Sequence, residues 1–526
     1  NKFEGAVEGS FGGTSGGAAN GSFNAMVNLP IIEDKLAIRA VVYADHRGGY
    51  IDNKYSTFTR EPTDLGSYYL AYNGNGNRLT AAQQTQGGKY DNAPLVEDNF
   101  NPVDYTGGRV ALSWQVAPDW DLLVSQAYQR LDTEGTFAVQ TYDYDYKPLT
   151  GLSSTLFAPQ YSKDDYSNTA WTLNGKVGDF SLVYTGAYLT RNITQQGDYT
   201  NYSRATYGIF YQCTGGANYY FDAGNAPFCH EPNSFWKDKV RNTHQSHEFR
   251  ISTPDDRRIR AIAGAYYEEF GIEDNMDWHY KTIPSCNPAL TAAQIRAAGS
   301  VCLGLVAPNP AATLNQSGPR GPAIAFGQDI QRGYKQYAAF GSVDFDILPN
   351  LTITAGTRYY NYQNYQRGSV YSSFSASCYQ APVCVTGSNL DALNLKSKYT
   401  GFKSKGTITW KPKDGTMVYA TFSQGFRPGA FNRGPSARVN DPIRPGVKQL
   451  LVPAAYAPDN LTNYEMGIKT DLFDRKVTFN ASAYYMEWKD TQIGFFNPAA
   501  GFGNTAFGTN GPTYHIKGAS AQIVAR

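Results

Sequence analysis

The feature that most constrains this chain is a repeated unit of alternating segments, tight turns and long polar connections. Segments of about ten residues place apolar side chains at every second position, as in Leu36, Ile38 and Val42. Alternation with a period of two over this length is typical of a β-strand with one apolar and one polar face. The sequence therefore predicts an all-β fold.

Sixteen strands of this kind can be placed along the chain. Their expected bounds are 2–11, 20–29, 35–45, 105–117, 119–131, 168–178, 179–191, 241–253, 258–271, 333–347, 350–360, 398–411, 415–424, 461–472, 475–489 and 513–525. A tilted strand of ~9–11 residues is long enough to cross a membrane. Lipid offers no partner to backbone groups, so such strands must close into a barrel. We expect an antiparallel transmembrane β-barrel.

The connections between these strands alternate between tight turns and long loops. Turns rich in Pro, Gly, Asn and Asp are expected at Pro30–Asp34, Pro118–Asp119, Gly178–Asp179, Pro254–Asp256, Pro349–Asn350, Pro412–Gly415 and Asp474–Arg475. The long loops are expected at 46–104, 132–167, 192–240, 273–332, 361–397, 425–460 and 490–512. Short turns at one rim and long loops at the other are typical of an outer-membrane barrel.

Composition excludes some classes of function and supports a membrane interface. The chain has 46 Lys and Arg against 45 Asp and Glu, so it lacks the basic footprint of a nucleic-acid binder. It has 40 Tyr, a residue that suits a membrane boundary because its ring is apolar and its hydroxyl is polar. The aromatic residues expected to form interfacial girdles are Trp120, Tyr359, Tyr360, Trp410, Tyr419, Tyr485 and Trp488.

Six cysteines lie close together in pairs within long polar segments. Fifteen pairings are possible, but proximity favours three disulfides, which are Cys213–Cys229, Cys286–Cys302 and Cys378–Cys384. Disulfides persist in an oxidising compartment such as the periplasm or the cell surface. The alternative is a set of free thiols in a reducing compartment.

Several segments resemble the barrel of TonB-dependent receptors. The stretch YATFSQGFRPGAFN at Tyr419–Asn432 resembles a family strand that ends in a GFRPG-type turn, and NYEMGIKT at Asn463–Thr470 resembles its NYE-x-G-x-K strand. The segment after Phe473, VTFNASAYYMEWKDTQI, is similar to the hairpin that follows. The opening EGSFGGTSGG and NAMVNLPIIEDKLAIRAVVYADHRGGYIDN are similar to the first barrel strands.

The resemblance implies more than these 526 residues supply. The family has a globular plug, an N-terminal energy-coupling segment and a barrel of 22 strands. We therefore expect residues 1–526 to be a partial barrel, without the plug and with roughly six strands missing. The implied partners are outer-membrane lipid of a Gram-negative bacterium, an inner-membrane TonB complex that binds the absent N-terminal segment, and an extracellular nutrient.

Candidate site residues follow from the two faces and from the loops. Residues expected to face the plug or the lumen are Arg39, Arg358, Arg427, Glu465 and Lys469. Loop tyrosines expected to bind a ferric siderophore, a glycan or another bulky nutrient are Tyr199, Tyr202, Tyr207, Tyr211, Tyr219, Tyr220 and Tyr362. The alternative for Arg427 is a turn residue without a binding role, and the alternative for the tyrosines is surface decoration.

No pattern in the sequence indicates an enzyme. The common catalytic and phosphate-binding motifs do not occur, and we expect no cofactor and no metal site. His244 and His247 lie three residues apart on a predicted strand, so they point to opposite faces and cannot chelate one ion. The sequence therefore predicts an energy-coupled importer, with a passive sixteen-stranded porin and a secreted glycan-binding propeller or sandwich as the alternatives.

Overall fold

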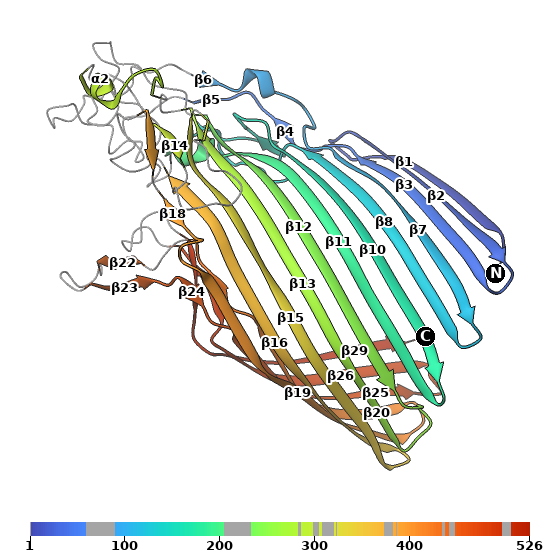
Figure 1. Cartoon of the computed structure of the whole chain (residues 1–526). Coiled ribbons are helices and arrows are strands. Elements are labelled where there is room, and N and C mark those ends of the chain that lie inside the picture. The colour runs from blue at the N-terminus through green and yellow to red at the C-terminus, as the bar shows by residue number, and fades with distance from the viewer. Residues whose placement is uncertain are drawn as a thin grey trace.

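A single antiparallel sheet dominates the computed structural model, which describes residues 2–58, 90–204, 233–281, 286–297, 304–307, 320–321, 323–372, 382–385, 387–433, 437–440, 448–496 and 506–525 (Figure 1). The sheet has 17 strands, of which β18 (Ser388–Asn389) contributes only two residues. The other sixteen correspond one to one with the predicted strands. They are β1 (Glu4–Gly13), β2 (Ala19–Ile32), β3 (Leu36–Arg47), β7 (Val103–Ala117), β8 (Trp120–Glu134), β10 (Tyr161–Val177), β11 (Phe180–Asp198), β12 (Ser234–Ser252), β13 (Ile259–Tyr280), β15 (Ile324–Leu348), β16 (Leu351–Ser372), β19 (Leu395–Lys413), β20 (Thr416–Arg427), β25 (Asp459–Leu472), β26 (Val477–Lys489) and β29 (Tyr514–Ala525).

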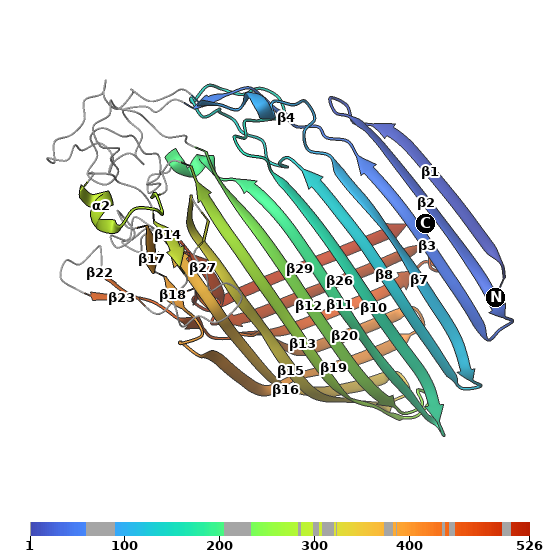
Figure 2. The same cartoon turned by 45° about the horizontal axis from the view of Figure 1, so that its top comes forward.

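These long strands pair in the order in which they occur in the chain. Within the described residues, β1 pairs only with β2 and β29 only with β26, so the sheet is not closed between β1 and β29. Figures 1 and 2 show the sheet curled, with β20, β25, β26 and β29 crossing behind β10–β13. The curl gives the sheet a concave inner face and a convex outer face. One meandering sheet rules out the propeller or sandwich alternative.

Tight turns join the strands at one end of the sheet, here called the turn end, as the sequence predicts. Gly178 and Gly415 adopt the left-handed conformation in two of these turns, with φ of 58° and 74°, and glycine is suited to that conformation because it has no Cβ. Most of the opposite rim, here called the loop end, consists of long connections. The five residues between β1 and β2 form the short connection there.

Several strands extend further into the loop end than the sequence predicted. β13 continues to Tyr280 instead of residue 271, and β16 continues to Ser372 instead of residue 360. Tyr362, which was assigned to a loop, therefore lies on β16. The apolar alternation fades in these extensions because their outer face becomes polar, as with Glu273 and Asn275 on β13 and Asn361 and Gln363 on β16. A membrane span needs only ~9–11 residues.

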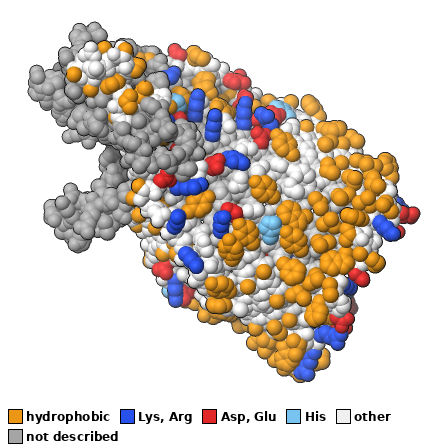
Figure 3. Space-filling view, viewed as in Figure 1, with side chains coloured by type: hydrophobic (Ala, Val, Ile, Leu, Met, Phe, Trp, Pro, Cys, Tyr) orange, Lys and Arg blue, Asp and Glu red, His pale blue; other side chains and the backbone are white. Residues whose placement is uncertain are grey.

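The outer face carries a girdle of aromatic side chains across neighbouring strands. Its ring centroids are 5.6 Å apart for Trp171 and His247, 6.2 Å for Tyr184 and His247, 6.1 Å for His247 and Tyr267, and 5.2 Å for Tyr267 and Tyr337. Figure 3 shows hydrophobic side chains spread over the outer face on the turn side of this level. This arrangement matches a lipid-facing surface with an interfacial aromatic row.

Part of the predicted girdle is wrong. Tyr360 is 8% exposed and stacks on Phe426, with ring centroids 4.1 Å apart. Tyr419 donates a hydrogen bond to the Glu465 carboxylate, and Trp488 contacts Asp459, so both lie on the inner face. Alternation alone could not assign these rings, because aromatic residues occupy both faces near the strand ends.

Short strands and helices lie at the loop end. They are β4 (Asp52–Asn53), β5 (Thr57–Phe58), β6 (Tyr90–Asp91), β9 (Ser153–Ser154), β14 (Leu305–Ala307), β17 (Val383–Val385), β21 (Ala430–Phe431), β22 (Ala437–Asn440), β23 (Lys448–Val452), β24 (Ala455–Tyr456), β27 (Gln492–Phe495), β28 (Phe507–Asn510), the α-helix α2 (Ala292–Ala297) and the 3₁₀ helices η2 (Ala93–Leu95) and η3 (Thr200–Arg204). None of the helices in the described part of the chain combines the length and the apolar character that a membrane crossing requires.

The first long loop folds onto the next one as a compact cap. Phe58, Tyr144 and Phe157 form one small apolar core of the cap. Asp52 accepts a hydrogen bond from Asn99 N–H at 2.9 Å and lies 2.7 Å from Lys54 Nζ. The hydrogen bond with Lys54 and, to a smaller extent, the hydrogen bond from Asn99 lower the pKa of the Asp52 carboxyl below its usual value. The cap is therefore held by its own packing and polar contacts.

The assignment of faces predicts opposite effects for adjacent residues on β15. Val343→Arg should lower the free energy of unfolding by about 2–4 kcal/mol, because Val343 is 44% exposed on the outer face within the apolar belt. Ser342→Arg, on the inner face, is the matched control and should cost much less. Urea titration of the protein in lipid vesicles measures both changes, and equal losses would contradict the assignment.

Candidate functional site

A polar and aromatic cluster lies on the inner face of the central strands. Its members come from β12, β13, β15 and β16, and they share the inner face because alternate residues of paired strands point the same way. The members are His244, Tyr266, Glu268, Phe270, Tyr334, Gln336, Arg358 and Tyr362. We call this set the Glu268 cluster.

Glu268 is the hub of its cluster. Its Oε1 accepts hydrogen bonds from His244 Nε2 and from the Tyr334 hydroxyl, both at 2.8 Å. Its Oε2 accepts a hydrogen bond from Gln336 Nε2 at 3.1 Å. The Glu268 side chain is 13% exposed, whereas that of His244 is 38% exposed. A carboxylate with this many donors is fixed in position, while its histidine partner remains open to the inner space.

Arg358, predicted to face the lumen, lies in this cluster. Its Nη2 donates a hydrogen bond to Gln336 Oε1 at 3.2 Å. Its guanidinium carbon lies 4.8 Å from the ring centroid of Tyr266 and 5.8 Å from that of Phe340. Contacts of this kind orient a guanidinium without neutralising it. Arg358 therefore presents a positive charge on the inner wall.

The predicted binding tyrosines that the structure describes are packed against this wall. Tyr362 is 6% exposed and stacks on Tyr334 at 4.7 Å between ring centroids. Tyr199 lies 4.9 Å from Tyr202 and 4.3 Å from Trp278 on β13. Burial raises the pKa of both Tyr199 and Tyr202 above the usual value, so these phenols stay neutral. Tyr207, Tyr211, Tyr219 and Tyr220 lie outside the described residues.

Nearer the loop end, the inner wall carries two buried carboxyl groups. Gln195 Nε2 donates to Asp238 Oδ2 at 2.9 Å, and Gln328 Nε2 donates to Asp274 Oδ2 at 2.6 Å. Arg332 Nη2 lies 3.6 Å from Asp274 Oδ2, and the Arg332 side chain is half-exposed. This part of the wall therefore combines fixed acids with an accessible guanidinium.

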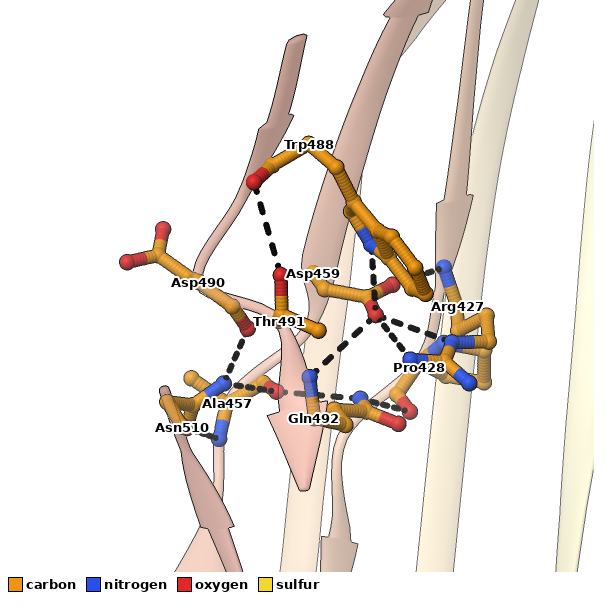
Figure 4. A network of polar contacts seen from close by, with 9 residues as sticks. All are labelled: Arg427, Pro428, Ala457, Asp459, Trp488, Asp490, Thr491, Gln492 and Asn510. Atoms are coloured by element: carbon orange, nitrogen blue, oxygen red, sulfur yellow. Dashed lines mark hydrogen bonds and ion pairs between the residues drawn. The ribbon is translucent and has the colours of Figure 1, made fainter. Parts of the chain in front are cut away.

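Arg427 belongs to a second polar network, drawn in Figure 4. Asp459 Oδ1 accepts the Arg427 backbone N–H at 3.0 Å, and its Oδ2 accepts Arg427 Nε at 2.8 Å and Trp488 Nε1 at 3.0 Å. The Asp459 side chain is 2% exposed and that of Arg427 is 52% exposed. The pairing anchors Arg427 at the start of its turn, while part of the guanidinium stays accessible.

Side chains from distant strands hold the GFRPG-type turn by its backbone. The carbonyl oxygen of Pro428 accepts Gln492 Nε2 at 2.9 Å, and that of Gly429 accepts Asn364 Nδ2 at 2.6 Å. A Cβ at Gly429 would collide with the carbonyl oxygen of Tyr456, so glycine is required for this close approach. The turn is thus fixed against β16 and β27.

The remaining predicted lumen residues lie apart from one another. Glu465 accepts a hydrogen bond from the Tyr419 hydroxyl at 2.6 Å. Lys469 is exposed and lines a hollow at the turn end, and Arg39 lines another hollow beside β1–β3 together with Arg109. Arg39, Lys469 and the Glu268 cluster therefore do not form one site.

The described residues include only part of what is needed to test the predicted disulfides and the expected lack of a metal site. Cys286 and Cys384 are disulfide-bonded. Cys213, Cys229, Cys302 and Cys378 lie outside the described residues, so the three pairings stay predictions. Within the part that the structure describes, no group of three or more His, Cys, Asp or Glu side chains is placed to hold a metal ion.

Sequence reasoning missed Glu268, Asp238 and Asp459. Glu268 lies on a predicted strand, and Asp238 lies just before one. The sequence alone does not distinguish one polar residue on the inner face from another, because it does not show their cross-strand neighbours. A usable signal was present for Glu268, because Tyr266, Glu268 and Phe270 alternate on one face of a strand. Asp459 precedes a predicted strand, and its partner Arg427 is too distant in sequence to suggest the pairing.

The comparisons with known proteins agree with this fold. Residues 230–526, more than half of the chain, match the family model described as "TonB dependent receptor-like, beta-barrel". This match leaves the passive porin alternative without support.

Solved structures share the fold at low sequence identity. The ferric yersiniabactin uptake receptor FyuA from Yersinia pestis has a TM-score of 0.57 at 13% identity, over 99% of this chain and 57% of that one. The ferric-catecholate import receptor Fiu from E. coli K12 has 0.57 at 11%, over 99% and 62%. The ferripyoverdine receptor of the outer membrane of Pseudomonas aeruginosa has 0.56 at 14%, over 100% and 54%. This chain therefore spans little more than half the length of the structures that it matches.

The Asp459 network yields a prediction about loop stability. Asp459→Ala leaves the Arg427 and Trp488 donors without their buried acceptor, so local stability should fall by about 1–3 kcal/mol. Hydrogen–deuterium exchange should then accelerate at residues 427–432 and 488–492. Asp490→Asn is the control, because Asp490 contributes its backbone carbonyl to the network. Unchanged exchange in Asp459→Ala would contradict the anchoring role.

The disulfide pairing can be tested without mutation. Proteolysis of the unreduced protein followed by mass spectrometry should yield peptides that link Cys286 to Cys302, Cys378 to Cys384 and Cys213 to Cys229. Recovery of any peptide that links two of these three pairs would contradict the proximity argument.

Proposed function

This chain belongs to the TonB-dependent receptor β-barrel family, and from this premise we propose that it forms the wall of an outer-membrane importer. The apolar outer face and its aromatic girdle support a location within lipid. The inner face supports a transport role, because it is lined by charged and aromatic side chains. The Glu268 cluster carries the proposal, since Gln336 and Glu268 link Arg358 and His244 in one hydrogen-bonded network on the inner wall.

The proposed substrate class is a bulky anionic chelate of ferric iron. A guanidinium with fixed orientation suits a negatively charged ligand, and the tyrosines around it offer ring surfaces and hydroxyls. The names of the similar structures give independent support, because they include receptors for ferric yersiniabactin, ferric catecholates and ferripyoverdine. A neutral glycan has no negative charge that could pair with Arg358.

Energy coupling is the remaining part of the proposal. We infer that release of the substrate into the periplasm depends on an inner-membrane TonB complex, as in the family. Arg427, Glu465 and Arg358 are the proposed wall contacts of a plug or of the substrate. Arg427 fits this role because half of its side chain stays accessible beside the buried Asp459.

Two arginines on β16 provide a matched test. Arg358 lies on the inner face, whereas Arg367 is exposed on the outer face with its guanidinium carbon 5.6 Å from the ring centroid of Tyr365. Expressed from the full-length gene in a host that lacks its own ferric-chelate receptors, Arg358→Gln should lower uptake of radiolabelled ferric chelates at least tenfold. Arg367→Gln should retain at least half of the wild-type rate at equal surface abundance.

The outcomes separate the parts of the proposal. Absence of uptake by the wild type for every ferric chelate offered would overturn the substrate class. Uptake that persists when the host's TonB complex is deleted would overturn energy coupling. Equal loss in Arg358→Gln and Arg367→Gln would remove the Glu268 cluster from the site.

A further inference from the structure

Four polar side chains form a row across the inner face near the loop end. They lie on β11, β12, β13 and β15, which are neighbours in the sheet (Figure 1), and they are Gln195, Asp238, Asp274 and Gln328. The register places Gln195 directly beside Asp238, and it places both Asp238 and Gln328 diagonal to Asp274. Asp238 is nine residues closer to the loop end of β12 than His247 of the girdle, so the row lies beyond the lipid. We call these four residues the carboxylate row.

Only part of the hydrogen-bonding capacity of the carboxylate row is used. Gln195 Nε2 donates to Asp238 Oδ2 at 2.9 Å, and Gln328 Nε2 donates to Asp274 Oδ2 at 2.6 Å. Within the described residues, Asp238 Oδ1, Asp274 Oδ1 and Gln328 Oε1 accept no hydrogen bond and are shielded from solvent. The three residues are 4%, 7% and 3% exposed. Buried acceptors without a partner are costly, so these oxygens require a donor or a cation.

A proton alone does not satisfy the carboxylate row. Burial, which is the largest cause, and the charge of Asp274 raise the pKa of the Asp238 carboxyl to about 6, so this group is ionised at neutral pH. At lower pH a proton could bridge the two acids, but Gln328 Oε1 would still lack a partner. The Gln328 amide cannot be reversed, because its oxygen would then face the Asp274 carboxylate. A positive ion that contacts all three oxygens satisfies them together.

The nearby arginines neutralise Asp274 but do not pair with Asp238. Arg332 Nη2 lies 3.6 Å from Asp274 Oδ2, and the Arg332 side chain is half-exposed. Arg433 is a second positive group close enough to interact with the Asp274 charge. Among the residues that the structure describes, no ion pair includes Asp238. The row therefore retains a negative charge without a counter-charge, and the half-exposed Arg332 is free to rotate away from an incoming ion.

We propose that the carboxylate row binds one calcium ion through Asp238 Oδ1, Asp274 Oδ1 and Gln328 Oε1. Ca²⁺ takes ~6–8 oxygen ligands in a flexible geometry, and water completes the shell once Arg332 has rotated away. Mg²⁺ suits the row less well, because it requires near-ideal octahedral geometry and gives up its water reluctantly.

The ion has a structural role in this proposal. It joins β12, β13 and β15 at the loop end of the inner wall, where the three ligands meet. Two carboxylates and one amide form a smaller acidic set than the groups of three or more His, Cys, Asp or Glu that are absent from the described residues. The inference goes beyond the import proposal, because the ion is a resident part of the wall and not the transported substrate.

A charge-matched pair of variants tests the proposal. The full-length protein, stripped of divalent ions with a chelator, is titrated with calcium chloride by calorimetry at neutral pH in sodium chloride buffer. The wild type should bind calcium saturably, and Asp238→Asn should bind it at least tenfold more weakly, because the change removes a ligand charge and keeps the side-chain shape. Asp344→Asn removes an acid from the inner face of β15 towards the turn end, where Asp344 accepts a hydrogen bond from Thr354. This control should bind within twofold of the wild type.

Two further measurements locate the ion and identify it. Arg332→Gln removes a competing positive charge, so it should tighten calcium binding, whereas a calcium site elsewhere would not respond. Calcium should slow hydrogen–deuterium exchange at residues 238–242 and 272–276 in the wild type but not in Asp238→Asn, and magnesium should not reproduce this effect.

Three results would overturn the proposal: no saturable calcium binding by the wild type, unchanged affinity in Asp238→Asn, or equal weakening in Asp238→Asn and Asp344→Asn. A melting temperature in chelator equal to that of the wild type shows that Asp238→Asn is folded. The readout is calcium affinity and not uptake, so failure of this inference is distinguishable from failure of the import proposal.

Discussion

Backbone pairing between neighbouring strands is the constraint on which the rest of this structure depends. Each long strand from β2 to β26 pairs with a strand on both sides over at least part of its length, so its N–H and C=O groups need no water there. The same ladder fixes which side chains are level with each other. It aligns the girdle on the outer face and the Glu268 cluster on the inner face, and one set of hydrogen bonds thereby creates both surfaces.

Local patterns in the sequence were sufficient for the architecture. The two-residue alternation located all sixteen long strands, and turn-forming residues such as Gly178 and Gly415 marked the turn end. The strand ends at the loop side were wrong because extensions such as the one that carries Tyr362 have no apolar outer face. The assignment of Tyr360, Tyr419 and Trp488 to the girdle was wrong because an aromatic side chain near a strand end packs well on either the outer or the inner face of the sheet.

The inner wall was less predictable because its contacts join residues far apart in sequence. Glu268 takes its partners from three strands, through His244, Tyr334 and Gln336, and no local pattern encodes that meeting. Alternation was sufficient to assign Arg358 to the inner face, whereas its contact with a plug or a ligand stays a prediction. The GFRPG motif drew attention to Arg427, but it did not indicate the buried partner Asp459, and the plug or lumen contact of Arg427 stays a prediction. The charge of a residue and the sheet face on which it lies can thus be predicted from the sequence, whereas its side-chain partners depend on the register between strands.

The extension of β13, β15 and β16 beyond the girdle has a consequence for how such a protein can diversify. The inner wall at the loop end of these strands is framed by continuous hydrogen-bonded ladders, so its geometry there does not depend on how the connecting loops pack. Insertions and substitutions in those loops can accumulate without shifting the side chains of the inner wall. For the proposed importer, recognition at the loop end and passage past the inner wall are then separable traits, and selection can alter one while it preserves the other.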